Sequence, residues 1–444
     1  MQNKLSVYEE LRDQGRDLIT RPPDTTTSPQ QSHRAKQNTT VTVTAYNRSS
    51  PHERRAVGVG RRWDVLHVWS TARILVPLLR EEGFDVHALC GRSEEEARSL
   101  AQELGIPFHT SQSDDVLLHP DVDLVCIYIP PPLTRQIAVK ALGIGKNVVC
   151  EKAATALDAF KMVTAARYYP QLLSIVGNAW RFLPAFVAMR RLLTEGYVGE
   201  LQVCDARVYG PSLLDQSYGW TCEELMGGGG LHTVGSALVD LLSHLVGKRA
   251  QRVHGLLRTF LQQNGAIRGI RRITSDDFCF FQMLMGGNSS GSGAGTASGV
   301  CCTVTLNFNM PGDFVHEVMV VGSAGRLIAR GTDLYGQRNG SVREELLLRD
   351  SGGAGPEVHL PHLRGLGSMV TALKQAFQGP TERRSWVRGP IDMAATFEDG
   401  LYVQTVVEAV KRSSRSGEWE SVEVMTQEPD PNQNLCEALQ RNKN

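Results

Sequence analysis

The sequence has no long hydrophobic run, and its charges are balanced. Its 444 residues carry 47 basic and 47 acidic side chains, so no net field would hold nucleic acid or an anionic membrane. Charged residues or glycines break every apolar stretch before it reaches the roughly 20 residues that span a bilayer. We therefore expect no nucleic-acid partner and no membrane insertion, and we expect a small-molecule ligand instead.

Cysteine motifs typical of disulfide frameworks or zinc sites are also absent. The nine cysteines are scattered and form no C-x-x-C pair, and several stand in apolar stretches such as residues 125–127. This pattern favours buried free thiols over a disulfide framework. We expect no metal site.

The two ends of the chain lack the periodicity of packed structure. Residues 1–53 are rich in Thr, Ser, Gln, Pro and Arg, a composition that predicts a disordered leader. No apolar signal segment stands at its start, which points to the cytoplasm. Residues 431–444 are expected to form a tail.

Residues 54–175 alternate between strand and helix signals. Alternation of this kind predicts right-handed crossovers and an α/β, Rossmann-like, doubly wound parallel sheet. The predicted strands are 84–90, 122–129 and 147–150, and the predicted helices are 94–104 and 133–142.

Residues 176–430 follow another pattern, in which strand-like segments succeed each other without long helices between them. This predicts a second, α+β domain with a mainly antiparallel open sheet, suited to hold a substrate and to form a dimer. Residues 286–299 are almost entirely Gly, Ser, Ala, Thr and Asn. We interpret them as a flexible hairpin connection, because no helix follows to make them a phosphate-binding loop.

Several separated stretches carry a family resemblance. They include Gly143–Lys152 (GIGKNVVCEK), Asn178–Ala185 (NAWRFLPA), Gly227–Asp240 (GGGGLHTVGSALVD) and Phe397–Gly400 (FEDG). Together they resemble the glucose-fructose oxidoreductase, inositol dehydrogenase and rhizopine catabolism (Gfo/Idh/MocA) family. The resemblance implies a Rossmann domain that binds NADP or NAD and a sugar or polyol held on the second domain. It also implies a homo-oligomer built through the open face of that domain's sheet.

The resemblance assigns a catalytic role to Lys152, which stands where family members carry a lysine after a strand. Glu151 would position it, and Ala153 replaces the family's proline. A lysine at the carboxyl end of a parallel strand would face the crevice where such sheets bind ligands.

The helix after the glycine run departs from the family. Where members carry an aspartate and a histidine, this chain has Thr233 and Ala237. His232 stands one position from the expected acid, about 100° around a helix, and is the remaining candidate for the base. The resemblance places Asp240 near the substrate, and Tyr209 could line the substrate sheet.

The glycine-rich turn that opens a Rossmann domain is missing. No glycine lies between Arg61 and Thr71, and the first strand is recoverable only as Val65–Trp69 or as Ala56–Gly60. Either the N-terminal portion is altered and the rest of the chain is that of a normal family member, or the dinucleotide site itself is degenerate. The cofactor contacts that we expect are Ser70, Thr71, Arg92, Ser93, Pro130, Glu151, Lys152 and Arg181. Arg92 and Ser93, with no acid beside them, favour the 2′-phosphate of NADP.

Two functions stay open. One is a weakened or inactive oxidoreductase that acts on a sugar or polyol. The other, implied by the resemblance, is a non-catalytic relative that is secreted and promotes extracellular matrix assembly, with matrix proteins as partners. The sequons at Asn38, Asn47, Asn288 and Asn339 would carry glycans only on the secretory route.

Overall fold

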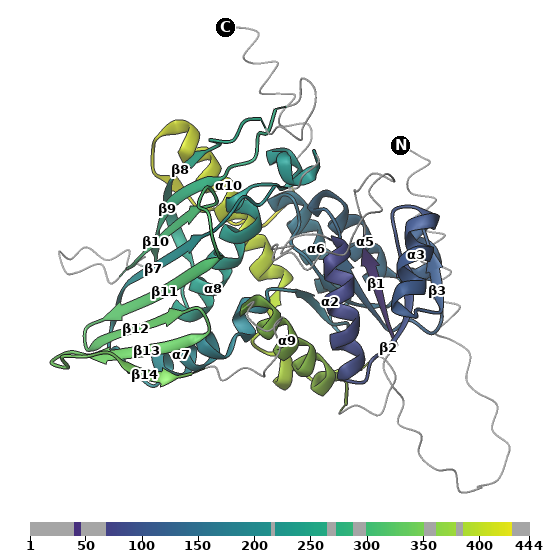
Figure 1. The fold of residues 1–444 in the computed structure, drawn as a ribbon, viewed down its shortest axis with the longest axis horizontal. Helices are drawn as coiled ribbons and strands as arrows, with labels where there is room; N and C mark the ends of the chain where they lie inside the picture. Colours follow the sequence, from purple (N-terminus) through teal and green to yellow (C-terminus); the bar gives the residue numbers. More distant parts are fainter. Residues whose placement is uncertain are drawn as a thin grey trace, which may run out of the picture. The chain divides into compact units, whose positions relative to one another are not determined.

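The fold consists of two sheets and the helices that cover them (Figure 1). The computed structural model describes residues 40–45, 68–214, 218–263, 272–286, 299–349, 361–378 and 385–428, with backbone alone for 40–45, 68–71 and 361–363. One sheet is mainly parallel and the other mainly antiparallel, so the predicted fold class is confirmed. Among the described helices, none has the length and apolar character that crossing a membrane requires.

The first sheet has the strand order β15-β6-β5-β4-β1-β2-β3. Neighbouring strands run parallel except β15, which pairs antiparallel with β6. The predicted strands at 84–90, 122–129 and 147–150 all lie in it. The strands are β1 (Thr40–Ala45), β2 (Asp85–Cys90), β3 (Phe108–Thr110), β4 (Leu124–Tyr128), β5 (Asn147–Cys150), β6 (Ser174–Val176) and β15 (Ala395–Thr396).

The first strand is not where the sequence led us to expect it. β1 lies inside the sheet between β4 and β2, where Val43 pairs with Cys126 of β4 and Leu89 of β2. This corrects the prediction that residues 1–53 are all a leader. It also corrects the Val65–Trp69 alternative, because helix α2 begins at Val68. Thr-Val-Thr-Val-Thr is a β-branched run suited to a strand, but its polar surroundings obscured it. Residues 46–67, which include the other alternative, lie outside the described residues.

Helices cover both faces of this sheet. One core packs α2 (Val68–Glu81), α3 (Glu94–Leu104) and α9 (Pro361–Gln378) against it. The other packs α4 (Ser113–Leu117), α5 (Pro131–Gly143), α6 (Ala156–Tyr168) and the start of α10 (Phe397–Ser416). Helices α9 and α10 and strand β15 come from beyond residue 360, so the chain returns to the first sheet after it has built strands β7 to β14 of the second.

The second sheet has the order β14-β13-β12-β11-β7-β10-β9-β8-β16, in which only β7 and β10 run parallel. Strands β9 and β10 pair antiparallel across residues 286–299, of which 287–298 lie outside the described residues. The strands are β7 (Leu201–Tyr209), β8 (Ala250–Arg258), β9 (Phe278–Met285), β10 (Val300–Asn307), β11 (Val315–Gly322), β12 (Gly325–Arg330), β13 (Asp333–Arg338), β14 (Glu345–Leu348) and β16 (Glu420–Ser421).

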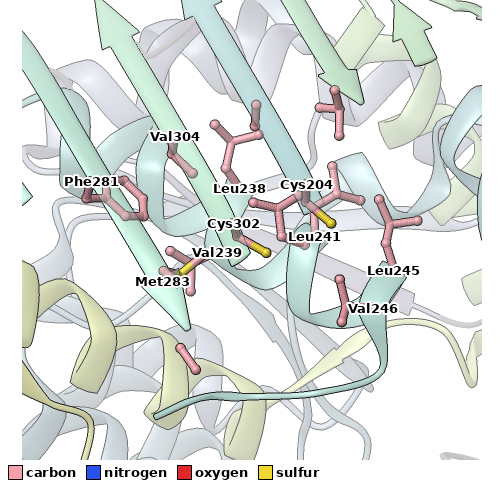
Figure 2. Packing of buried hydrophobic residues seen from close by; sticks show 14 of the residues in the cluster. Cys204, Leu238, Val239, Leu241, Leu245, Val246, Phe281, Met283, Cys302 and Val304 are labelled. Carbon is pink, nitrogen blue, oxygen red and sulfur yellow. The ribbon is translucent and has the colours of Figure 1, made fainter. Parts of the chain in front are cut away.

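One face of the second sheet carries its core. Alternate residues of β9, among them Phe281 and Met283, are fully buried, as the period of two in a strand requires. Figure 2 shows Leu238 and Leu241 of α8 (Ser236–Val246) packed over Cys204 and neighbouring strand residues. Helix α7 (Pro184–Thr194) and α10 complete this layer. The eight described cysteines are all free and seven are buried, as the sequence predicted.

Candidate functional site

Lys152 lies at the carboxyl edge of the parallel sheet, two residues beyond the end of β5. Its ammonium Nζ donates to Glu151 Oε2 at 3.4 Å and to the Thr233 carbonyl at 3.3 Å. Thr233 belongs to η4 (Leu231–Gly235), a π-helical turn that leads into α8. Lys152 therefore lies between the parallel sheet and the helix of the second domain, where the sequence placed it. Its catalytic role stays a prediction.

The glycine run before η4 is needed for contacts within the chain itself. A Cβ on Gly228 would lie 2.3 Å from the Thr221 carbonyl oxygen, and one on Gly229 would lie 2.2 Å from Asp276 Oδ1. Gly229 also has a φ of 96°, which side chains disfavour. The sequence left a choice between close approach to a ligand and a flexible helix entry. The structure gives a third reason, close packing on Thr221 and Asp276.

The two positions of the expected acid and base hold no proton-transfer group. Thr233 Oγ1 donates to the Gly229 carbonyl at 2.6 Å inside the helical turn. Ala237 offers only its carbonyl, which accepts from Asn178 Nδ2 at 3.1 Å. A hydroxyl turned back on its own helix and a methyl group cannot take the proton of a substrate hydroxyl.

His232 faces the loop after β5. The side chain is fully buried, and Nε2 lies 3.2 Å from the Ala153 carbonyl, which can only accept, so Nε2 carries the proton. Burial, helped by the positive charges of Lys152 and Lys411, lowers the pKa of His232 to about 3. An imidazole with so low a pKa is a weak base at neutral pH, so the geometry gives little support to His232 as the replacement base.

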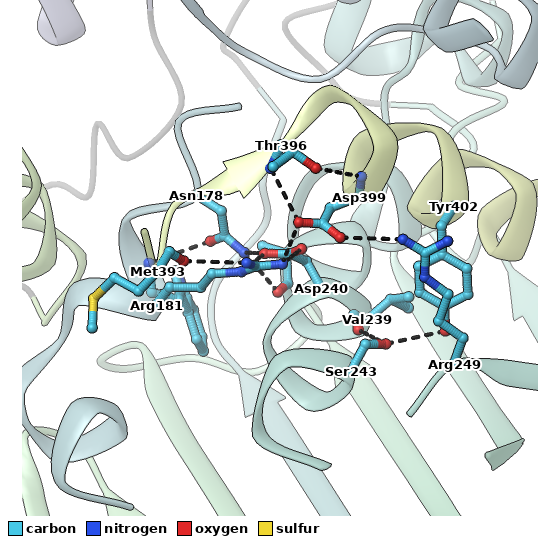
Figure 3. A network of polar contacts seen from close by, with 12 residues as sticks. Asn178, Arg181, Val239, Asp240, Ser243, Arg249, Met393, Thr396, Asp399 and Tyr402 are labelled. Atoms are coloured by element: carbon cyan, nitrogen blue, oxygen red, sulfur yellow. Dashed lines mark hydrogen bonds and ion pairs between the residues drawn. The ribbon is translucent and has the colours of Figure 1, made fainter. Parts of the chain in front are cut away.

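Arg181 and Asp240, predicted as cofactor and substrate contacts, bind each other instead (Figure 3). Arg181 lies in η1 (Ala179–Phe182), and its Nε donates to Asp240 Oδ2 at 2.8 Å while its Nη2 donates to Oδ1. Asn178 Nδ2 also donates to Asp240. The side chains of Arg181 and Asp240 are only 7% and 6% exposed. In this structure each group is satisfied by the other, and their contacts with a cofactor and a substrate stay predictions.

A second carboxylate completes this network. Asp399 Oδ2, near the start of α10, lies 3.2 Å from Arg181 Nη2, and Arg181 Nη1 donates to the Met393 carbonyl at 3.2 Å. Burial lowers the pKa of Arg181, but the carboxylates of Asp240 and Asp399 outweigh this and raise it. Asn178 and Asp399 stand in stretches that carried the family resemblance. Nothing in their local sequence showed that both contact the Arg181–Asp240 pair.

The predicted cofactor residues of the strand ends lie along one edge. Arg92 follows β2 and pairs with Glu96 of α3, with 44% of its side chain exposed. The Ser93 hydroxyl caps α3 by accepting from the Glu96 amide at 3.3 Å. Pro130 is half-buried and precedes α5 after β4. Ser70 and Thr71 stand in the first turn of α2, and their side chains are outside the described set.

Tyr209 points away from this edge. It is the last residue of β7 and is half-buried, whereas its neighbour Val208 is buried in the core under α8. Successive side chains of a strand face opposite sides of a sheet, so Tyr209 lies on the open face. Its role in lining the substrate sheet stays a prediction.

One group of side chains could hold a metal ion, although the sequence predicted none. Ligand atoms of His87, His119 and Asp121 all lie within 4.8 Å of one another. The His119 Nδ1 atom already accepts from the Asp121 amide at 3.3 Å. His87 lies early in β2 and Asp121 just before β4, at the opposite edge of the sheet from Lys152. The group therefore has no part in the site around that lysine.

Two family models match the chain. The model described as "Oxidoreductase family, NAD-binding Rossmann fold" matches residues 58–176, and "GFO/IDH/MocA C-terminal domain" matches residues 186–328. The first match begins after β1 and covers the edge that carries Arg92 and Lys152. The second covers the glycine run, η4 and α8.

Curated relatives match over most of their length. "Glucose-fructose oxidoreductase domain-containing protein 2" of Homo sapiens is 68% identical over 393 residues, 87% of this chain and 98% of the relative. "Glucose-fructose oxidoreductase domain-containing protein 1" of Mus musculus is 56% identical over 384 residues, 84% of this chain and 96% of the relative.

Solved structures share the fold at low identity. An oxidoreductase domain protein from Kribbella flavida has a TM-score of 0.68 at 22% identity, covering 87% of this chain and 99% of its own. A levoglucosan dehydrogenase in complex with NADH and L-sorbose has a TM-score of 0.67 at 18% identity, covering 88% and 100%.

Proposed function

The chain belongs to the Gfo/Idh/MocA family of oxidoreductases, and from this premise we propose that it is an NAD(P)-dependent oxidoreductase with weakened or lost activity. Its substrate would be a sugar or polyol hydroxyl. The observation that carries the proposal is the position of Lys152, at the carboxyl end of β5 and 3.3 Å from the carbonyl of Thr233 in η4. This is the edge at which open α/β sheets bind ligands.

The described strand ends fit a dinucleotide. A Cβ on Gly91 would lie 2.9 Å from Ala97 Cβ, so the turn after β2 brings the amino end of α3 close to the edge. Arg92 there is half exposed and can turn to a 2′-phosphate, and Ser93 lies beside it. When bound, a nicotinamide dinucleotide supplies the hydride carrier. A levoglucosan dehydrogenase of the same fold binds NADH, which supports this interpretation.

Lys152 would hold the substrate. Its ammonium can donate to the oxygen of a hydroxyl group and polarise it, and Glu151, 3.4 Å from Nζ, positions it. The proton of that hydroxyl has no acceptor at Thr233 or Ala237. A positioned general base contributes about 10²- to 10⁴-fold in rate, and its loss is the reason that we propose weakened activity.

Nucleotide titration into the purified full-length chain tests this function. We expect saturable binding of NADPH, seen by fluorescence, that is weaker for NADH. Arg92→Ala should weaken NADPH binding and leave NADH unchanged. Arg98→Ala, which removes an exposed arginine of the adjoining helix α3, is the matched control and should change neither. Absence of binding by well-folded protein would overturn the oxidoreductase proposal.

A polyol screen follows from a positive titration. Slow reduction of NADP in the presence of a sugar or polyol, lost in Lys152→Ala, is the expected result. Lys152→Arg keeps the charge and should retain part of the activity. Turnover that is unchanged by Lys152→Ala would exclude the assigned role.

The second candidate is a non-catalytic, secreted protein that promotes extracellular matrix assembly. The observation that favours it is the loss of both proton-transfer groups, at Thr233 and Ala237. Asn339 of a sequon is exposed at the end of β13, so it can accept a glycan. A glycosidase-sensitive chain in culture medium, with the shift lost in Asn339→Gln, would support secretion, and co-sedimentation of that chain with matrix proteins would support the partner class. Chain found only in the cytosol would contradict it.

We also propose a homo-oligomer through the open face of the second sheet. Val203, Leu256 and Leu284 project from this face with 36–40% of their surface exposed. Apolar side chains on an uncovered sheet face favour association. Light scattering after gel filtration should give a multiple of the 48.8 kDa chain mass, reduced by Leu284→Glu.

A further inference from the structure

Three side chains near the amino ends of β2 and β4 are arranged as ligands for a metal ion. They are His87 in β2 and, just before β4, His119 and Asp121. Their ligand atoms all lie within 4.8 Å of one another. The centre of an equilateral triangle with that side lies about 2.8 Å from each corner, whereas zinc binds such ligands at about 2.0–2.2 Å. Each side chain therefore needs only a small movement to reach a shared ion.

The two imidazole rings already have the spacing that a shared ion requires. Their centres are 4.7 Å apart, and their planes are tilted by 52°. Two imidazoles that bind one zinc ion at about 2.0–2.1 Å have ring centres about 5 Å apart. Phe108 of β3 packs against His119, with ring centres 5.4 Å apart, and gives the site an apolar wall. Both histidines are half-buried and Asp121 is exposed, so an ion can enter from solvent.

A β-bulge gives His87 its position. The neighbours Val41 and Thr42 of β1 pair with Val86 and Ala88 of β2, so His87 is the extra residue in this pairing. Bulges bend a strand, re-aim a side chain and recur beside functional sites. The backbone therefore places His87 independently of its contact with the other ring.

The other two ligands lie on a braced turn. The Val122 amide donates to the His119 carbonyl at 3.3 Å, with Pro120 and Asp121 between them, and proline at this position favours a tight turn. Lys146 is 2% exposed, and its ammonium donates to the carbonyls of His119 and Val122, both at 2.7 Å. Both ends of the turn are therefore fixed, so little backbone has to be ordered when an ion binds.

One contact breaks when an ion binds. The Asp121 amide donates to His119 Nδ1 at 3.3 Å, and a neutral imidazole has only one nitrogen that accepts. An ion on either ring nitrogen therefore replaces this hydrogen bond. The contact is long and its donor belongs to an exposed residue, so water can satisfy the amide instead.

We propose that His87, His119 and Asp121 form a binding site for a divalent transition-metal ion of the zinc type. Two imidazoles and one carboxylate suit zinc, whereas calcium and magnesium prefer oxygen ligands. The positive charge of Lys146 beside the turn also disfavours ions that bind through charge alone. Three protein ligands leave a fourth position for water. The ion ties β2 to the segment before β4, and its binding does not depend on the dinucleotide proposed near Lys152.

Calorimetric titration of zinc chloride into the full-length chain, after treatment with a chelator, tests the site. We expect zinc to bind at this site and to raise Tm by roughly 2–5 °C at saturation. His119→Gln and Asp121→Asn should each weaken binding at least about 10-fold, the smallest loss seen even for outer-shell partners of a metal. His109→Gln, which removes a half-buried histidine of β3, is the control and should leave the affinity unchanged.

Two results would overturn the site. One is the absence of zinc binding by folded protein. The other is binding that neither His119→Gln nor Asp121→Asn weakens, since the ion would then be held elsewhere, for example by the exposed thiol of Cys301. If His119→Gln does not fold, Asp121→Asn decides the test alone, because its side chain is exposed. NADPH binding tests the proposed function separately, so either proposal can fail without the other.

Discussion

The carboxyl edge of the parallel sheet and the helical segment η4–α8 differ in how far their polar side chains are exposed. At the sheet edge, the Arg92 side chain is 44% exposed and pairs with Glu96 in the first turn of the next helix, α3. Across from it, the polar groups of η4 and α8 are turned inward. His232 and Asp240 are buried, and each is bonded to another part of the chain.

This difference bears on what each region can do. An exposed ion pair contributes little to stability, so Arg92 can leave Glu96 for a ligand at small cost. A buried pair that loses one partner leaves an uncompensated charge, so Arg181 cannot leave Asp240. On the proposed function, the sheet edge would therefore supply the cofactor contact, whereas the buried pair at the helix stabilises the fold.

The largest effect is expected from rebuilding the helix chemistry. Thr233→Asp with Ala237→His restores the acid and base that the family resemblance implies, next to Lys152. If the sheet edge is competent, turnover of a polyol with NADP should rise by about 10²- to 10⁴-fold, measured by absorbance of the reduced nicotinamide. Thr233→Asn with Ala237→Gln is the control of similar size. If the variant binds NADPH but shows no gain in polyol turnover, the carboxyl edge of the parallel sheet also lacks the geometry for catalysis.

Breaking the buried pair should destabilise the protein strongly. Arg181→Met leaves Asp240 buried without its cation, and we expect the free energy of unfolding to fall by about 3–5 kcal/mol, measured by denaturant titration. Adding Asp240→Leu to this variant should recover much of the loss. Arg191→Met, which removes an exposed arginine paired with Glu195, is the control. A small effect of Arg181→Met would mean that the network is not structural.

The sequence predicted the regular parts of the molecule well. Helix α3 begins after the Ser93 cap and ends at Gly105, whose φ is 62°, and both are local signals. Strand β1 was missed because it stands in a polar stretch of the chain, and its pairing with β4 and β2 leaves no local signal. The Arg181–Asp240 pair was missed for the same reason, since 59 residues separate the partners. Asp276 gave no signal, because an aspartate before a strand is common in turns.

The third prediction concerns pH and compares the two buried titratable groups beside the glycine run. The pKa of Asp276 is raised to about 7 from 3.8, so the folded state holds that proton more tightly and stability falls as pH rises from about 4 to 7. The pKa of His232 is lowered to about 3 from 6.5, so its contribution is lost as pH falls below 6.5.

Asp276→Asn isolates the first of these effects. Between pH 5 and 7.5 the stability of the variant relative to the native protein should increase by roughly 2–3 kcal/mol, measured as the difference between two pH series of unfolding curves. His232 contributes equally to both series and cancels. A difference that does not change with pH would mean that Asp276 is already ionised at pH 5.

The smallest effect is expected at Arg92. Its pair with Glu96 joins the residue before the Ser93 cap to the first turn of α3 at the surface, and surface pairs contribute about 0.2–1 kcal/mol. Arg92→Ala should therefore lower the free energy of unfolding by no more than that, as should Arg98→Ala, which removes the neighbouring pair with Glu94. A loss from Arg92→Ala that approaches the loss from Arg181→Met would show that the sheet edge stabilises the fold as strongly as the helix does. A small loss of stability, together with weaker NADPH binding, would mean that Arg92 contributes to ligand binding and contributes little to the stability of the fold.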